Sequence, residues 1–228
     1  MKVAVLGAGA IGSSVAADIA KAGHDLTVID QWPAHIEAMK ANGLRVKIPD
    51  EEIHVAVDAV HLCDVSSLNR MFDLVLMSAK SYDSQWLAQF IAPYLKADGV
   101  LVPVQNSMND EWVAPIIGAE RDVACAFELS AEVFTPGIVQ RNTMRDRTWF
   151  SLCVKLGRET MAVGKALGIE IEPIFGMSAE EFNVSTDAIV EKLLRAILIH
   201  HGETARQVRG VVLQDYLKGR MTETDYVN

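Results

Sequence analysis

The stretch Val3-Ala4-Val5-Leu6-Gly7-Ala8-Gly9-Ala10-Ile11-Gly12 joins a short apolar run to three glycines with the spacing G-x-G-x-x-G. A continuous apolar run of this kind is typical of a buried parallel strand. We expect Gly7 to permit a tight turn, Gly9 to let a pyrophosphate approach the backbone, and Gly12 to let the next helix pack closely. The helix predicted over 11–22 would direct its N-terminal amides at the phosphates. The stretch therefore predicts a dinucleotide-binding βα unit; the alternative is a glycine-rich turn that binds nothing.

The rest of the first half alternates between short apolar runs and helical patterns. Further strands are predicted over 25–29, 44–48, 53–57, 74–77, 100–104 and 122–127, and helices over 33–41, 83–95 and 110–116. This alternation is the signature of a parallel sheet with crossover helices. From Leu152 the apolar period is helical, with helices predicted over 152–167 and 187–200. The predicted class is α/β: a Rossmann-type doubly wound parallel sheet in residues 1–150, and a smaller all-helical C-terminal domain in residues 151–228.

The composition limits the kinds of partner. The chain has 228 residues, of which 50% are hydrophobic, and a formal net charge of -9. Nucleic acids and anionic membranes are bound through basic surfaces, so the acidic balance argues against both. The three cysteines form no C-x-x-C pair, which is typical of a reducing compartment. No apolar run is long enough to span a membrane, so we expect a cytoplasmic protein. No metal site is predicted, because the adjacent His200 and His201 would diverge on a helix and lack further ligands at suitable spacing.

Polar residues follow the ends of several predicted strands, where an open parallel sheet binds its ligand. The sites selected by this rule are the glycine loop, Asp30, Ser78-Ala79-Lys80 and Gln105-Asn106. A carboxylate at Asp30 can accept hydrogen bonds from ribose hydroxyls and repels a 2′-phosphate, which favours NAD over NADP. Lys80 can supply positive charge to the dinucleotide, and Asn106 can donate to and accept from a ribose hydroxyl or a ketone oxygen. The alternatives are a solvated aspartate, a surface lysine and an asparagine that opens a turn.

Four motifs of this chain occur together in one known family. They are the glycine loop, Lys80-Ser81-Tyr82-Asp83, Val104-Gln105-Asn106-Ser107-Met108-Asn109, and the late Leu213-Gln214-Asp215 with Gly219-Arg220-Met221-Thr222-Glu223-Thr224-Asp225. With these motifs the chain resembles ketopantoate reductase (2-dehydropantoate 2-reductase). The late motif is the most specific, because its Gly-Arg-x-Thr-Glu-x-Asp core and its spacing are unusual. The resemblance covers both ends of the chain and most of its middle.

The resemblance implies NAD(P)H-dependent reduction of a small-molecule 2-oxo acid to a 2-hydroxy acid, with the substrate bound between the two domains. It implies catalytic roles for Asn106 and Glu223. It also implies that Asn106 and Asp215 bind the substrate. Ala131 would lie near the nicotinamide. Gln31 stands where the family usually has an arginine for the 2′-phosphate, which again favours NAD. The full set of implied cofactor-binding residues is Gly7, Ala8, Gly9, Ala10, Ile11, Gly12, Asp30, Gln31, Lys80, Asn106, Ala131 and Glu223.

The chain departs from the family where the proton donor is expected. That donor is a lysine on the first helix of the second domain, in a W-x-K-x-x-x-N setting, and no such lysine is identifiable here. Lys155 is followed four residues later by Glu159 rather than asparagine, and roughly half a domain of the usual size is missing before the Glu159 helix. Gly210-Val211-Val212 replaces the usual Ser-Ser-Met and so removes a hydroxyl that would help to hold the substrate carboxylate. The substrate can therefore be either ketopantoate or a related 2-oxo acid.

Three interpretations of the function follow. The leading one is a 2-oxo acid reductase. The others are a dinucleotide-binding sensor or scaffold without catalysis, and a related dehydrogenase for opine-like or hydroxyacyl substrates. The apolar face predicted for the helix 187–200 fits either a homodimer interface or packing inside the helical domain.

Overall fold

The chain divides into two compact units, the first formed by Met1–Asn142 with Gln207–Asn228 and the second by Thr143–Arg206. The computed structural model describes residues 1–48, 51–125, 127 and 129–142. It also describes 158, 161–163, 165–166, 168, 173, 177–178, 180–181, 188–192, 215 and 217–222. The predicted domain boundary at 150/151 lies outside these described residues, as does Glu223.

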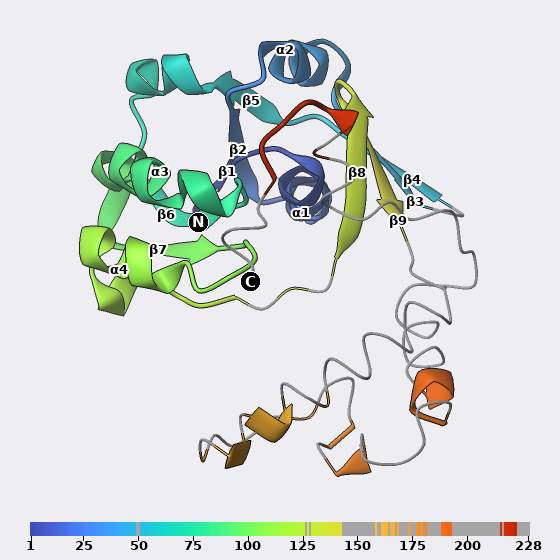
Figure 1. Cartoon of the computed structure of the whole chain (residues 1–228). Coiled ribbons are helices and arrows are strands. Elements are labelled where there is room, and N and C mark those ends of the chain that lie inside the picture. The colour runs from blue at the N-terminus through green and yellow to red at the C-terminus, as the bar shows by residue number, and fades with distance from the viewer. Residues whose placement is uncertain are drawn as a thin grey trace. The chain divides into compact units, whose positions relative to one another are not determined.

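A five-stranded parallel sheet forms the centre of the first unit (Figure 1). Its order is β5-β2-β1-β6-β7, and all four pairings are parallel. The strands are β1 (Lys2–Leu6), β2 (Asp25–Asp30), β5 (Asp58–His61), β6 (Phe72–Met77) and β7 (Leu95–Pro103). Residues Val3 to Leu6 are all buried, as expected for a strand covered on both faces. The predicted Rossmann-type sheet is therefore confirmed.

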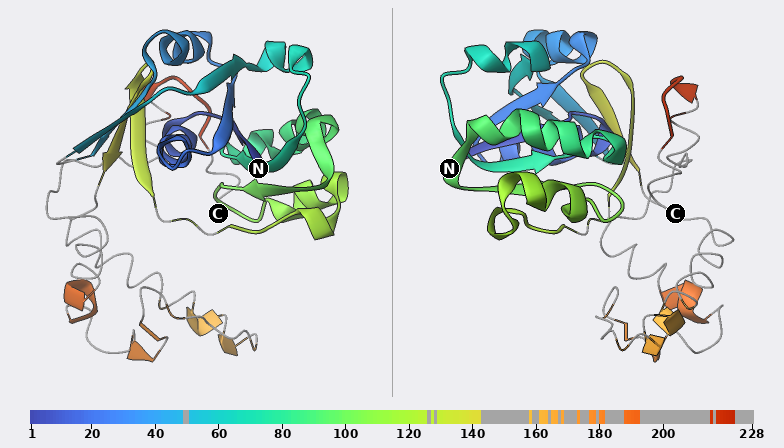
Figure 2. Two further views of the ribbon diagram at one scale, coloured as in Figure 1. Left: turned by 180° about the vertical axis from the view of Figure 1, so that it is seen from behind. Right: turned by 60° about the vertical axis from the view of Figure 1, so that its left-hand side comes forward.

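Helices cover both faces of this sheet. The helices are α1 (Ala10–Lys21), α2 (Pro33–Asn42), α3 (Ser84–Ile91) and α4 (Asp110–Ile117). Because side chains alternate along a strand, Val3 and Val5 pack with residues of α1 and α2, and Ala4 and Leu6 pack with residues of α3 and α4. In the right-hand view of Figure 2 the green helices α3 and α4 lie in front of the sheet. Short 3₁₀ helices occupy Leu62–Ser67, Ser81–Asp83, Ala92–Tyr94 and Ala119–Arg121.

A second, four-stranded sheet lies on the other side of α1, which contacts the strands of both sheets (Figure 1). Its order is β4-β3-β9-β8. The strands are β3 (Leu44–Ile48), β4 (Glu51–Val55), β8 (Ser130–Thr135) and β9 (Ile138–Asn142). Two antiparallel hairpins, β3–β4 and β8–β9, are joined by the parallel pair β3–β9. Arg141 links this sheet to α1, because its guanidinium donates to the carbonyl of Ser14 and pairs with Asp18.

Three predicted elements differ from the structure, one of them the strand predicted over 100–104, which already begins at Leu95. The strand predicted over 122–127 is wrong for the described residues of that range, where only an isolated bridge joins Asp122 to Leu101. The helix predicted over 83–95 is broken at Ile91 and followed by a 3₁₀ turn that contains Pro93, because a proline has no N–H to continue an α-helix. The short strand β5 escaped prediction because its sequence, Asp58-Ala59-Val60-His61, has only two apolar residues.

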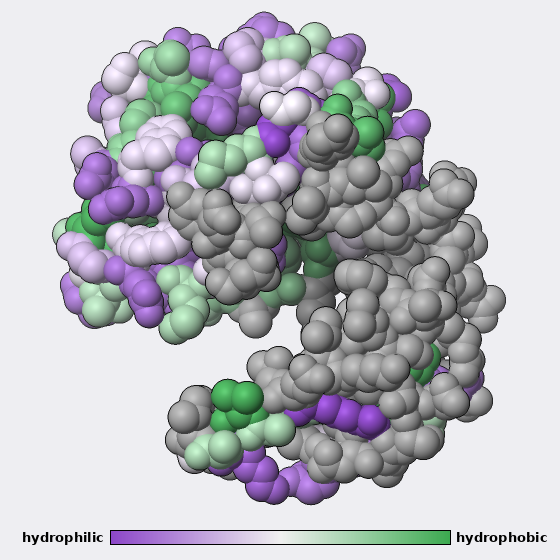
Figure 3. Space-filling model, viewed as in Figure 1, coloured by the Kyte–Doolittle hydropathy of each residue, from purple (hydrophilic) through white to green (hydrophobic). Residues whose placement is uncertain are grey.

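In the second unit, the described residues of the two predicted helices, Arg158, 161–163, 165–166 and 188–192, are helical. Ile189 and Val190 are buried in the single chain. On the face drawn in Figure 3, the hydrophobic residues of the first unit form small separate areas among hydrophilic and pale ones. Within the described residues, no helix has both the length and the apolar content that crossing a membrane requires.

Candidate functional site

Backbone hydrogen bonds hold the carboxyl ends of four parallel strands at one edge of the sheet. Each bond joins the first residues beyond one strand to the end of its neighbour. Three such bonds, each 2.8 Å long, run from the amide of Gly7 to Ile29, from Ser78 to Leu6 and from Val104 to Met77. The glycine loop, Asp30, Lys80 and the Gln105-Asn106 segment therefore come together at this edge, as the parallel arrangement predicts.

The three glycines of the loop have different surroundings. Gly7 has φ +93°, and a Cβ there would lie 2.7 Å from the backbone nitrogen of Ala79. A Cβ at Gly12 would overlap the carbonyl oxygen of Gly7. A Cβ at Gly9, in contrast, would meet no atom within 4 Å. Gly7 and Gly12 are thus required by close packing, whereas Gly9 borders open space at the N-terminus of α1, where backbone amides suit an anion. The loop fits the pyrophosphate of a dinucleotide.

The carboxylate of Asp30 is fixed by two backbone amides. Its Oδ2 accepts from the amide of Ala8 at 2.5 Å, and its Oδ1 accepts from the amide of Trp32 at 2.7 Å. Each oxygen keeps a second lone pair for a ribose hydroxyl. Asp30 therefore orients the glycine loop in addition to the ribose-binding role predicted for it. Gln31 is exposed beside it, with its carbonyl 3.0 Å from Nε2 of His61.

Lys80 forms an ion pair with a residue 135 positions later in the chain. Its Nζ lies 2.6 Å from Oδ2 of Asp215, whose side chain is only 4% exposed. Lys80 was predicted on the cofactor side and Asp215 on the substrate side, and the structure brings the two together. A second link joins the hydroxyl of Tyr82, as donor, to the carbonyl of Met221 at 3.4 Å. The late motif thus packs on the same edge of the sheet as the glycine loop.

Two further cations of the late motif lie over aromatic rings. The guanidinium of Arg220 is 5.8 Å from the centre of the Trp32 ring, and Nζ of Lys218 is 4.7 Å from that of Phe134. Burial first, and then the positive charge of Arg220, lower the pKa of Lys218. Lys218 and Arg220 therefore add two cations beside the Lys80–Asp215 ion pair, and this excess of positive charge suits an anionic ligand.

The loop after β7 is held by buried polar side chains. Asn106 is exposed, and its carbonyl accepts from Oγ of Ser81 at 2.8 Å and from Nδ2 of Asn109 at 2.5 Å. The side-chain Nε2 of Gln105 donates to the carbonyl of Ala79 at 2.8 Å. Gln105 thus joins two loops, and Asn106 presents its own side chain to the solvent. Ser81 and Asn109 have positioning roles that the sequence motifs contained but did not explain.

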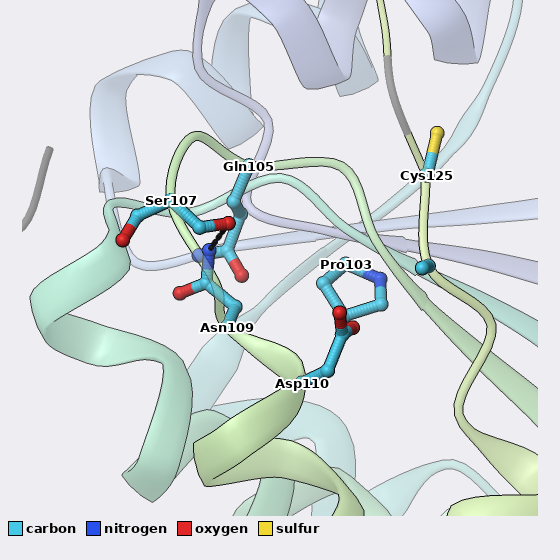
Figure 4. A pocket seen from close by; sticks show the side chains of 7 residues that line it. Pro103, Gln105, Ser107, Asn109, Asp110 and Cys125 are labelled. Carbon is cyan, nitrogen blue, oxygen red and sulfur yellow. Dashed lines mark hydrogen bonds between the residues drawn. The ribbon is translucent and has the colours of Figure 1, made fainter. Parts of the chain in front are cut away.

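A cavity of about 400 Å³ opens beside this loop (Figure 4). Its lining residues are Pro103, Gln105, Ser107, Asn109, Asp110, Ala124 and Cys125. Ser107, which lines the cavity, has φ +76°, a conformation that L-residues rarely adopt. The cavity therefore lies next to Asn106, at the same end of the sheet as the glycine loop.

The remaining predicted site residues are less tightly grouped. Ala131 lies on β8 of the second sheet, 7% exposed, in the hydrophobic cluster that also includes Ala8. Glu223 and Lys155 lie outside the described residues. Among the described residues, no group of three or more His, Cys, Asp or Glu side chains could hold a metal ion. Ser13 and His35, which lie beside the loop, belong to none of the sequence motifs, because buried polar contacts between helices leave no periodic signal.

Asp122 supports a prediction about stability. Burial, followed by the negative charge of Asp110, raises the pKa of Asp122 to about 6, and neither carboxylate oxygen has a hydrogen-bond partner within the described part of the chain. Because this pKa lies above the unfolded value of about 3.9, the folded state is penalised above about pH 6 and not below about pH 4. We expect Asp122→Asn to raise the free energy of unfolding by about 1 kcal/mol at about pH 8, with the gain lost by about pH 4. Urea denaturation at the two pH values measures this; the exposed Asp64→Asn should show no such change.

Comparison with known proteins identifies the family. Residues 3–153 match the family model described as ketopantoate reductase PanE/ApbA, which is more than half of the chain. This chain belongs to the ketopantoate reductase family. The resemblance inferred from the four sequence motifs is therefore confirmed.

Individual proteins are similar to this chain over different shares of their length. The 2-dehydropantoate 2-reductase of Lactococcus lactis is 29% identical over 111 residues, which are 49% of this chain and 35% of that protein. This chain thus spans about a third of the length of that relative. A PanE/ApbA family ketopantoate reductase from Ralstonia eutropha has the same fold, with a TM-score of 0.67 and 20% identity over 100% of this chain and 89% of that one. D-mandelate dehydrogenase, solved with NADH and anilino(oxo)acetate, shares the fold with a TM-score of 0.57 and 23% identity over 62% of this chain and 45% of its own.

Proposed function

We propose that this chain binds NAD(H) or NADP(H) at the glycine loop and acts in the reduction of a 2-oxo acid to a 2-hydroxy acid. The observation that carries the proposal is the open space at Gly9, bordered by the N-terminus of α1 on the edge that also bears Asp30, Lys80 and Asn106. Membership of the ketopantoate reductase family supports it. So does the NADH bound by D-mandelate dehydrogenase, which shares this fold.

Most of the proposed site residues have a defined task in this proposal. The amides of the loop from Gly7 to Gly12 bind the pyrophosphate, and Lys80 adds positive charge. A reduced nicotinamide would supply a hydride to the ketone carbon, and the resulting alkoxide oxygen would take up a proton from solvent. The amide of Asn106 orients the ketone or the neighbouring ribose hydroxyl, since its backbone is held by Ser81 and Asn109. Asp215 fixes the ammonium of Lys80, and Glu223 and Ala131 complete the proposed set.

Asp30 favours NAD(H) as the cofactor. Its carboxylate is held at the end of β2 by the amides of Ala8 and Trp32, so it cannot turn away from a 2′-phosphate without losing both bonds. A fixed negative charge repels a phosphate and accepts hydrogen bonds from ribose hydroxyls. The exposed Gln31 beside it offers no cation to compensate.

The proposal is tested by measuring the oxidation of NADH and NADPH by absorbance. We expect oxidation that depends on a 2-oxo acid, with NADH preferred, in a panel that contains ketopantoate, smaller 2-oxo acids and aryl 2-oxo acids. Opine-type substrates (a 2-oxo acid plus an amino acid) and acyl substrates serve as comparison. Oxidation of NADH only with the opine-type or acyl substrates would favour the related dehydrogenase instead. Tight binding of NADH without turnover of any substrate would favour the non-catalytic sensor or scaffold.

A further inference from the structure

Two buried polar side chains next to the glycine loop have no role in the chemistry described above. Ser13 on α1 and His35 on α2 are both 0% exposed, and Oγ of Ser13 lies 3.1 Å from Nε2 of His35. Buried polar groups cost free energy unless they are hydrogen-bonded, so their partners decide what they do. Both side chains have partners in the loop or in the second sheet.

The direction of each hydrogen bond follows from one backbone amide. The amide of Gly137, in the β8–β9 turn, donates to Nδ1 of His35 at 2.8 Å, so Nδ1 carries a lone pair. A neutral imidazole then has its hydrogen on Nε2, which donates to Oγ of Ser13. The hydroxyl of Ser13 in turn donates to the carbonyl of Ala8 at 2.7 Å. A continuous chain of bonds thus runs from the second sheet to the glycine loop.

This chain of bonds sets the orientation of the peptide between Ala8 and Gly9. Ala8 is held on both sides, because its amide donates to Asp30 and its carbonyl accepts from Ser13. A trans peptide is planar, so the N–H of Gly9 points opposite to the carbonyl of Ala8. With that carbonyl fixed toward the core, the N–H of Gly9 is directed away from Ser13. Gly9 is also the residue beside the open space.

The surroundings of His35 keep the ring neutral. Burial, the largest influence, lowers the pKa of His35 below its ordinary 6.5. The negative charge of Asp30 and a hydrogen bond with the backbone of Ala8 oppose this shift, and the positive charge of Arg220 adds to it. The ring also stacks on Trp32, with centroids 5.1 Å apart and planes 13° apart. Protonation would place a second N–H on Nδ1, facing the amide of Gly137. The bond to Gly137 would then be lost.

We propose that Ser13 and His35 are positioning residues for the dinucleotide, which hold the Ala8–Gly9 peptide in the orientation that binds the pyrophosphate. The inference rests on the proposed function, since it assumes that a dinucleotide occupies the glycine loop. It adds that the loop is connected, through the neutral tautomer of His35, to the hairpin that carries Ala131.

Ser13→Ala and Ser14→Ala form a matched pair for the test. Both serines are buried on α1, but Oγ of Ser14 has no hydrogen-bond partner in the described residues, whereas Oγ of Ser13 bonds the loop. In the full chain we expect Ser13→Ala to raise the Kd for NADH about tenfold, as for the loss of one buried hydrogen bond. Ser14→Ala should leave the Kd within about twofold. Thermal unfolding of both variants checks that the fold is retained. Equal Kd values for the two variants would overturn the inference.

The pH dependence of binding separates positioning from a merely structural effect. Calorimetric titration with NAD⁺ should show that wild-type affinity falls as the pH drops through the lowered pKa of His35. In Ser13→Ala the bonds from His35 through the hydroxyl of Ser13 to Ala8 are absent, so the affinity should be weaker and should fall less steeply over the same pH range. An equally steep fall in the variant would contradict the inference. If the wild-type chain binds neither NAD(H) nor NADP(H) at any pH, the proposed function itself is wrong, which this series distinguishes from failure of the inference alone.

Discussion

Replacing Gly9 with alanine is expected to abolish dinucleotide binding and to leave the fold unchanged. The backbone of Gly9 has φ -64° and ψ -163°, which alanine can adopt, and its Cβ would meet no atom within 4 Å. The methyl group would instead occupy the space into which a pyrophosphate must come. We expect the Kd for NADH to rise by at least about 100-fold, or about 3 kcal/mol. Fluorescence titration measures the affinity, and the melting temperature should stay within about 2 °C.

Gly12→Ala is the matched control for stability, because it should weaken the fold, which Gly9→Ala leaves unchanged. Its Cβ would overlap the carbonyl oxygen of Gly7 and approach Cβ of Ser78, so α1 must move away from the sheet. Overpacking against backbone atoms costs roughly 3 kcal/mol of the free energy of unfolding. Wild-type affinity in Gly9→Ala would show that the dinucleotide does not approach this loop. An unchanged melting temperature in Gly12→Ala would contradict the packing role of that glycine.

The sequence predicted the elements that carry a repeating or contiguous signal. The buried strand at Val3 to Leu6, the following helix and the strand that ends at Asp30 lie within one residue of their predicted bounds. The rule that parallel strands share their carboxyl edge then placed Lys80 and Asn106 beside the glycine loop. In these elements the secondary structure favoured by the local sequence pattern is also the one that the whole fold requires.

Elements that depend on distant neighbours could not be predicted in this way. Strand β5 has only two apolar residues and is defined by its pairing with β2. The joining of β3 to β9 connects segments about ninety residues apart, for which no local pattern exists. For the same reason, no sequence pattern predicts that Lys80 pairs with Asp215. The bonds of His35 to Ser13 and Gly137 are likewise visible only in the structure.

Lys80→Met is expected to weaken both the fold and dinucleotide binding. The substitution leaves the carboxylate of Asp215, which is 4% exposed, without its ammonium partner at 2.6 Å. Removal of one member of a buried pair is strongly destabilising, and because Lys80 is 23% exposed we expect the loss to be about 2 kcal/mol of the free energy of unfolding. Lys40→Met breaks an exposed pair with Glu37 and should cost less than about 0.5 kcal/mol. Denaturant unfolding of both variants makes the comparison.

The double variant Lys80→Met/Asp215→Leu separates the two effects of Lys80. Removing both charges eliminates the unpaired carboxylate, so the free energy of unfolding should return to within about 1 kcal/mol of the wild type. The affinity for NADH should not recover, because the positive charge proposed for the dinucleotide is still missing. We expect a Kd at least about tenfold above the wild type in both the single and the double variant. Recovery of the affinity together with the stability would mean that Lys80 acts only as the partner of Asp215, and its proposed contact with the cofactor would then be withdrawn.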